Sequence, residues 1–304
     1  MPKRQHPKKP KTPDLHSVDL KVWRAETHQK ALHRELSAID EVGVFSFVPK
    51  IERDGFDHSF YPTNPLKAPE DVLRVPDSVL ASLGDCIHNL RSALDHLAYN
   101  LVLASGVKPD NQVTFPVCHT ETVRNKCTGA EEPSLKIDVR DDIREWIDSV
   151  QPYKGTTTGK RLAVLHDLDI IDKHRAQLVT VLAAGALRKK YTRDNFEAAR
   201  QFPVWERPIW ISPEPLEYGK KCLTVSYAAP QMEIDPYLSI RIQILFGKGS
   251  PARGQTVTAV VDDLVRLVRY ELIPASLRFF SLAPYPQSIF SWRHDDTSES
   301  TWVQ

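Results

Sequence analysis

The segment from about residue 77 to residue 104 most constrains the fold, because it is typical of one long helix with two chemically distinct faces. With about 100° of rotation per residue, its apolar side chains fill one arc of the helix and its polar side chains fill the other. The apolar arc contains Leu83, Ile87, Leu90, Leu94, Leu97, Ala98 and Leu101. The polar arc contains Asp85, His88, Asn89, Arg91, Ser92, Asp95, His96, Tyr99 and Asn100. The helix therefore offers one face to a core and one face to polar chemistry.

This polar arc contains neither Lys nor Glu, which usually dominate a helix face exposed to water. Short polar groups together with His, Asn and Tyr are typical of a functional site or of a buried interface. The arc could also be a structural network whose members satisfy one another, or an ordinary surface. We favour a site and keep the other two interpretations as alternatives.

A second helix, expected at about 160–183, carries charges where apolar residues are expected. Asp172 and Arg175 fall inside its apolar stripe, and buried charges must be paired or neutralised. They can pair with each other or reach the polar arc of the 77–104 helix. Three further polar residues lie together on the other side of this helix, and a fourth flanks the apolar stripe. These are His166, Asp169 and Lys173, and the flanking His174.

The remaining segments alternate between helix and strand signals. We expect further helices at about 16–41, 139–149 and 256–279, the last one bent near Pro274. A β-hairpin is expected at about 44–61, because Asp54-Gly55 favours a tight turn, and about three antiparallel strands between 203 and 247. The buried stripe of the first helix is expected to contain Leu20, Trp23, Ala31 or Leu32, and Leu36. The prediction is an α+β fold, with a helical-bundle core, an early β-hairpin and a C-terminal antiparallel β segment closed by a helix.

The expected organisation has four parts. They are a disordered basic tail at 1–15, a helical core at 16–185 with the inserted hairpin, a β-rich segment with the C-terminal helix at 186–282, and a tail at 283–304. The first 13 residues hold five Lys or Arg and no acid, so they suit an acidic surface such as RNA or DNA, or simply aid solubility.

The composition is that of a globular protein, with 304 residues, 41% hydrophobic side chains and a formal net charge of +1. No apolar run approaches the roughly 20 residues that cross a bilayer, and a secretory signal is not seen. Four cysteines without a CxxC pair indicate reduced thiols and no structural zinc. We expect a cytoplasmic protein with no membrane segment, no metal and no other cofactor.

The run from Arg91 to His96, RSALDH, resembles the R-x4-6-H signature of HEPN-like nucleases, which lies on a long helix of an α-helical core. The resemblance implies that the Arg and the His act in a cleft between two protomers and cut RNA without a metal. A histidine can move the proton of a ribose hydroxyl, and an arginine can hold the charge that grows on phosphorus. We therefore assign Arg91, Asp95 and His96 as catalytic candidates. The supporting or substrate-binding candidates are His88, Asn89, Asp172, Lys173, His174 and Arg175.

The wider arrangement also resembles a widespread bacterial family to which no activity is assigned. HNLRSALDH, FPV, QPY and DKHR carry this second resemblance, over roughly residues 20–185. The predicted function is a metal-independent endoribonuclease of HEPN-like type that acts on RNA as a homodimer and has a possible antitoxin partner. One alternative is a non-catalytic binding or interaction protein with a buried polar network. The other is a metal-dependent hydrolase that uses His88, Asp95, His96, Asp169 or His174 on facing helices.

Overall fold

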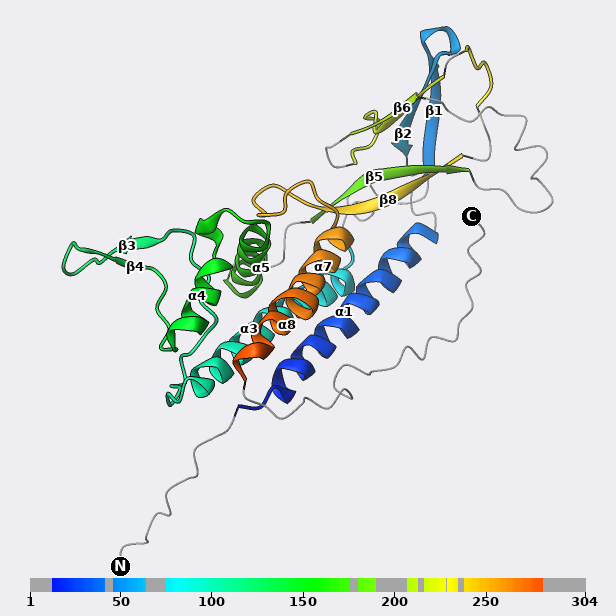
Figure 1. Ribbon diagram of the computed structural model, residues 1–304. Coiled ribbons are helices and arrows are strands. Elements are labelled where there is room, and N and C mark those ends of the chain that lie inside the picture. Colours follow the sequence, from blue (N-terminus) through cyan, green and yellow to red (C-terminus); the bar gives the residue numbers. More distant parts are fainter. Residues whose placement is uncertain are drawn as a thin grey trace, which may run out of the picture.

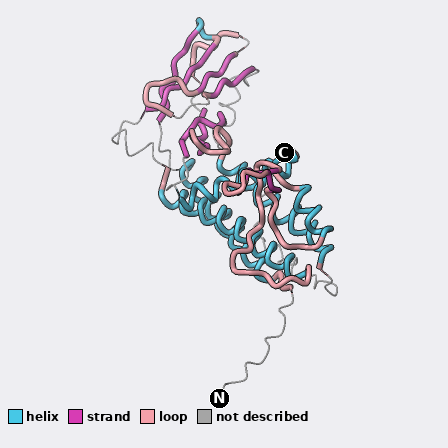
Figure 2. The backbone as a smooth tube through the Cα atoms, turned by 90° about the vertical axis from the view of Figure 1, so that its left-hand side faces the viewer, coloured by secondary structure: helices cyan, strands magenta, loops and turns pink. Residues whose placement is uncertain are grey.

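The computed structural model describes residues 13–41, 46–63, 75–174, 180–189, 207–212, 216–227, 229–234 and 238–280. Long helices pack into one bundle, and most of the strands lie at one end of that bundle (Figures 1 and 2). The predicted α+β class is confirmed, as are the early hairpin and the helix that follows the C-terminal strands.

Helix α3, Asp77–Ala104, lies in the middle of the bundle and has the bounds that the sequence predicts. It packs against α1, His16–Glu41, and against α5, Thr157–His174. Helix α7, Val257–Arg266, contacts all three of them. It continues through a π-helical turn, a short helix α8 and a 3-10 turn, at Leu267–Leu272, Ile273–Ser276 and Leu277–Phe279. The short helix α4 spans Asp141–Ser149, and a 3-10 turn follows at Pro152–Lys154. All seven apolar residues of the predicted α3 stripe are buried in the common core.

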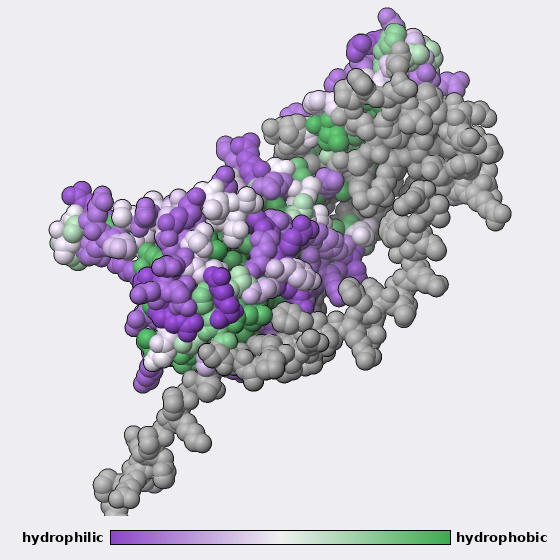
Figure 3. Space-filling view, viewed as in Figure 1, coloured by the Kyte–Doolittle hydropathy of each residue, from purple (hydrophilic) through white to green (hydrophobic). Residues whose placement is uncertain are grey.

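The strands form three antiparallel groups. The largest is a sheet in the order β1-β2-β7-β6, with bounds Ser46–Glu52, Asp57–Thr63, Leu223–Ser226 and Arg207–Ile211. Strands β5, Thr180–Lys189, and β8, Leu238–Phe246, pair with each other beside the bundle. Strands β3, Thr122–Arg124, and β4, Glu131–Pro133, form an arm whose surface is mostly hydrophilic in Figure 3. The hairpin turn joining β1 to β2 places Arg53, Asp54 and Gly55 at positive φ.

The structure corrects the predicted end of the second helix. Helix α5 ends at His174, and residues 180–189, partly assigned to the helix, form β5. Thr180, Val181 and Leu182 instead pair with Phe246, Leu245 and Ile244 of β8. Only Thr180 and Val181 of β5 are β-branched, and its Ala and Leu residues favour a helix, so pairing with a strand from far along the chain overrides the local propensity. Residue 185, where the predicted helical core ends, lies within β5.

The structure also corrects the predicted buried stripe of α1. Trp23 is 50% exposed and Leu20 is 46% exposed. The residues of this helix that face the core are Leu15, Val18, Val22, Ala25 and Leu32. Both sets fit a helical period, and the small Val18, Val22 and Ala25 side chains allow α1 to pack closely against α3. The prediction was wrong for Leu20 and Trp23, but it is confirmed for Leu32, which is fully buried, and for Leu36, which packs partly buried against the core.

Between α1 and the π-helical turn, Arg269 is shared by two partly buried carboxylates. Its Nε atom lies 2.9 Å from Glu26 Oε1. Asp19 Oδ2 is buried and lacks a hydrogen-bond partner among the described residues. Burial raises the pKa of Asp19 to about 6, although the charges of Arg269 and His16 act against it. One arginine therefore does not fully stabilise both negative charges.

Asp19→Asn is expected to stabilise the protein at pH 8 by about 1 kcal/mol and to change little at pH 4. Because the folded pKa of Asp19 is raised above 3.8, its stabilising contribution is complete below pH 4 and is lost as pH rises through about 6. Urea unfolding of both proteins at the two pH values measures this. Asp138→Asn, at an exposed position, is the control. An equal effect of Asp19→Asn at both pH values would contradict the assignment.

None of the helices in the described part of the chain is both long enough and apolar enough to cross a membrane.

Candidate functional site

The interface between α3 and α5 contains a histidine, a carboxylate and a lysine in contact. His88 Nδ1 lies 3.3 Å from Asp169 Oδ1, and Lys173 Nζ lies 2.7 Å from Asp169 Oδ2. Asp169 is only 3% exposed, whereas the His88 side chain is 46% exposed. The buried carboxylate therefore fixes the His88 ring and directs its other nitrogen, Nε2, away from Asp169. A histidine held in this way can exchange protons with a bound molecule.

Asp172 lies one turn beyond Asp169 on α5, directly over Gly84 of α3. A Cβ atom added to Gly84 would lie 2.6 Å from Asp172 Oδ1, so the missing side chain lets this carboxylate approach the helix. Partial burial and the nearby charge of Asp169 raise the pKa of Asp172, while His88 lowers it. Asp172 thus joins the His88 cluster.

Arg91 is buried at 5% exposure and holds an irregular segment against α3. Its Nη2 donates a hydrogen bond of 2.7 Å to the Phe115 carbonyl. Its Nη1 lies 2.9 Å from Asp95 Oδ1 but is not aligned to donate a hydrogen bond, so this contact is an ion pair. The Phe115 N–H in turn donates to Asp95 Oδ1 over 2.9 Å. Burial raises the pKa of Asp95, whereas Arg91 and this N–H favour its charged form.

His96 lies on the other side of the α3 polar face, next to α1. Burial and the charge of Lys21 lower the pKa of His96, so its neutral form is favoured. Arg91 and His96 thus have different surroundings, the first near Phe115 and the second near α1, and they form no common site within one chain. This separation agrees with their angle of about 140° on a helical wheel.

Two asparagines of the polar arc are buried and hold the backbone. Asn89 Nδ2 donates to the Asp85 carbonyl over 2.7 Å. Asn100 Nδ2 donates to the His96 carbonyl, and its Oδ1 accepts a hydrogen bond of 2.7 Å from the Asp14 N–H. Asn100 therefore ties the start of α1 to α3. Of the two other candidates in the DKHR motif, His174 is the last residue of α5, and Arg175 lies outside the described residues.

Two further histidines, His119 and His166, lie beside the His88 cluster. His119 Nε2 is 3.0 Å from Asp167 Oδ1, and the rings of His119 and His166 are 6.3 Å apart. Burial lowers the pKa of His166, and so does the charge of Arg91. His166, Asp169 and Lys173 could be found from their spacing on one helix. His119 could not, because it comes from an irregular segment.

Gln151 of the QPY motif positions the segment that carries His119. This side chain is fully buried. Its Nε2 donates to the carbonyls of Pro116 and Ile147, each over 3.0 Å, and its Oε1 accepts from the Cys118 N–H over 2.9 Å. The motif residues Arg91, Phe115 and Gln151 thus belong to one network that fixes this segment beside α3 and α5.

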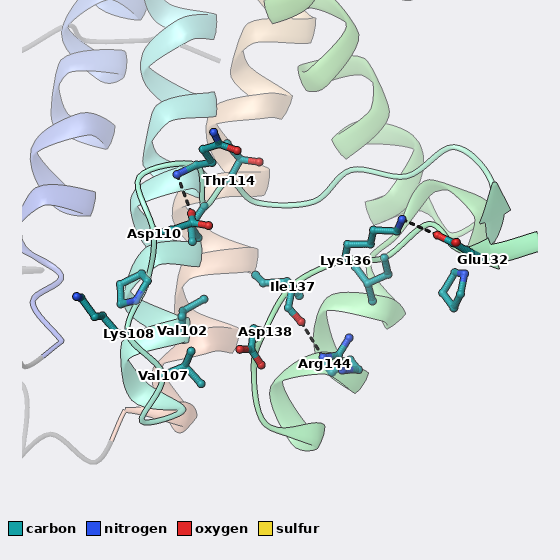
Figure 4. Close-up of a pocket in the computed structure, with 15 residues that line it drawn as sticks. Val102, Val107, Lys108, Asp110, Thr114, Glu132, Lys136, Ile137, Asp138 and Arg144 are labelled. Carbon is teal, nitrogen blue, oxygen red and sulfur yellow. Dashed lines mark hydrogen bonds and ion pairs between the residues drawn. The ribbon is translucent and has the colours of Figure 1, made fainter. Parts of the chain in front are cut away.

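A pocket of about 820 Å3 lies elsewhere, between the end of α3 and the segments 107–114 and 132–138 (Figure 4). It contains an ion pair of 2.9 Å between Lys136 and Glu132, and Arg144 donates to the Ile137 carbonyl. None of the predicted site residues lines this pocket. Its acidic and basic side chains are equally mixed, so it favours no particular ligand.

Within the described ranges, no group of three or more His, Cys, Asp or Glu side chains is placed to hold a metal ion. No family model, curated protein or solved structure matches the chain.

Proposed function

We propose that the protein is a metal-independent endoribonuclease of HEPN-like type, which acts on RNA as a cytoplasmic homodimer. The observation that carries the proposal is the His88 cluster. It combines a half-exposed imidazole, a buried carboxylate that orients it and a half-exposed lysine next to both. An acid-base group beside a cation is what cleavage of an RNA phosphodiester requires.

The dimer supplies the second acid-base group. His88 and His96 are eight residues apart, or about 12 Å along α3, which is too far for both to reach one phosphate. An antiparallel pairing of two α3 helices about a two-fold axis at Ser92 would place His88 opposite the partner's His96. Both positions lie four residues from Ser92, whose small side chain permits a close approach.

In this mechanism the partner's His96, neutral because of its lowered pKa, accepts the proton of the ribose 2′-hydroxyl. The 2′ oxygen then bonds to phosphorus. The bond between phosphorus and the 5′ oxygen breaks, and protonated His88 donates its proton to that oxygen. Lys173 offsets the charge on the phosphate. Arg91 acts as a positioning residue, because its contacts hold Phe115 and Asp95.

His88→Gln is expected to lower the rate of RNA cleavage by two to four orders of magnitude, with EDTA present throughout. The control is His33→Gln, which removes another half-exposed histidine that lies 2.8 Å from a carboxylate, in this case Asp262. Cleavage of a labelled RNA pool measures the effect. Wild-type protein that cuts no RNA, or a His88→Gln protein as active as the control, would contradict the proposal.

A mixture of two inactive variants tests the dimer. In a heterodimer of His88→Gln and His96→Gln chains, one of the two composite sites keeps both histidines. Since half of the dimers in an equal mixture are heterodimers, about a quarter of the wild-type rate should return. A mixture that stays inactive would mean that the histidines do not act across a dimer.

A non-catalytic interaction protein is the second candidate. The burial of Arg91, Asn89 and Asn100 favours it, because these side chains serve the fold and are not presented to a substrate. The possible antitoxin partner would be an inhibitor under the first proposal and a binding partner under this one.

A further inference from the structure

Helix α1 separates its charges by sign. Its carboxylates Asp19 and Glu26 turn toward Arg269, and Glu35 accepts a hydrogen bond of 3.1 Å from Ser82 on α3. The negative charges of the helix between His16 and Ser37 are therefore turned toward the bundle.

The cations of α1 lie on its outer face. Arg24, Lys30 and Arg34 are exposed, and none of them forms an ion pair with another residue that the structure describes. Half-buried Lys21 lies on a different side of the helix, about 180° around from Lys30, and its charge lowers the pKa of His96. From Arg24 to Arg34 the row spans about 15 Å along the helix. Between His16 and Ser37 the outer face of α1 is thus a basic strip, and none of the carboxylates in this described part of the helix is fully exposed.

An aromatic side chain stands within this strip. Trp23, 50% exposed, is next to Arg24 in the sequence and one and two turns from Thr27 and Lys30. Half of the surface of Trp23 is open to solvent, so its indole ring can stack on a flat partner. Cations that follow a backbone, combined with an aromatic ring that stacks on a base, are the usual features of single-strand binding.

We propose that the outer face of α1 binds the phosphate backbone of a single-stranded RNA, with Arg24, Lys30 and Arg34 against phosphates and Trp23 against a base. The choice of RNA rests on the proposed function, because α1 packs directly against α3, the helix that carries His88 and His96. An anionic membrane surface is the poorer fit. The apolar stripe of α1 is already buried in the core, and only Trp23 and Leu20 remain to enter a lipid layer.

The test measures binding of a fluorescent 2′-O-methyl oligonucleotide, which cannot be cleaved, at several salt concentrations. The triple variant Arg24→Gln, Lys30→Gln, Arg34→Gln should bind at least tenfold more weakly at low salt. The slope of log affinity against log salt should become shallower by about 2, because each lost phosphate contact contributes roughly 0.7. Trp23→Ala should weaken binding about fivefold or more and leave the slope unchanged.

The matched control removes three exposed cations elsewhere, in Lys126→Gln, Lys248→Gln, Arg253→Gln, and should bind as the wild type does. The inference would be overturned if both triple variants bound the oligonucleotide equally well. It would also be overturned if the α1 triple variant lost binding to anionic phospholipid vesicles but kept its binding to RNA. Because binding is measured without cleavage, an inactive wild-type protein that still binds through α1 would reject the nuclease proposal and keep this one.

Discussion

Arg91→Ala is expected to lower the free energy of unfolding by about 3 kcal/mol or more, which is a large share of the stability of a typical domain. The substitution removes the hydrogen bond to the Phe115 carbonyl and leaves Asp95 as a half-buried charge without its cation. The segment around Phe115 also loses its anchor on α3. Guanidinium unfolding, followed by circular dichroism, measures the change.

The control for this experiment is Lys136→Ala, which breaks an exposed ion pair with Glu132 at the same four-residue spacing. Its cost should stay below about 1 kcal/mol. His96→Ala should also cost less than about 1 kcal/mol, because its ring makes fewer obligatory contacts. If Arg91→Ala unfolded at the same denaturant concentration as Lys136→Ala, Arg91 would not be a structural clamp, and a direct catalytic role would regain support.

Gly159→Ala is expected to destabilise the protein by about 2 kcal/mol, although alanine is the better helix former by about 1 kcal/mol. A Cβ atom at this position would lie 2.5 Å from the Gln151 carbonyl oxygen and 3.2 Å from Pro152 Cα. These are backbone atoms, which cannot relieve the contact by rotating as a side chain can. Helix α5 must therefore move away from the QPY segment. Since Gln151 holds the residues before His119, cleavage should fall with stability.

Gly84→Ala provides the comparison, because the three atoms nearest to its Cβ would all belong to the carboxylate of Asp172. This side chain can rotate, and the gain in helix propensity offsets part of the cost, so the net change should stay within about 1 kcal/mol. The denaturant midpoints of Gly159→Ala and Gly84→Ala measure the difference in stability between the two variants. Similar midpoints for both would show that α5 moves more freely than this packing implies.

The sequence predicts α3 well because every signal in that segment agrees. Its apolar arc, its polar start and its Ser-Gly end all favour one helix, and the structure has the same bounds. The helix α1 shows where such reasoning fails. Two apolar sets compete on it, and only the contact with α3 decides that Val22 and Ala25 are buried while Trp23 is exposed.

The candidate site was predictable only in its helical parts. The spacing of Asp169 and Lys173 on one helix is visible in the sequence, as is His88 on another. The placement of Phe115 and Gln151 is not, because both belong to irregular segments that are positioned by contacts far apart in the chain. Burial of Arg91 likewise depends on the Phe115 carbonyl, 24 residues away, which no helical wheel includes.

The order of the β1-β2-β7-β6 sheet has a consequence for synthesis on the ribosome. Ser59 of β2 meets Thr224 of β7, 165 residues later in the chain. At about 5 to 20 residues per second, the β1-β2 hairpin waits roughly 8 to 30 seconds for its third strand. A two-stranded hairpin is marginal on its own, and the open edge of β2 can pair with other chains in the meantime. Completion of the sheet is therefore a late step, and the nascent chain depends on chaperones or on its own helices to shield that edge until β7 emerges.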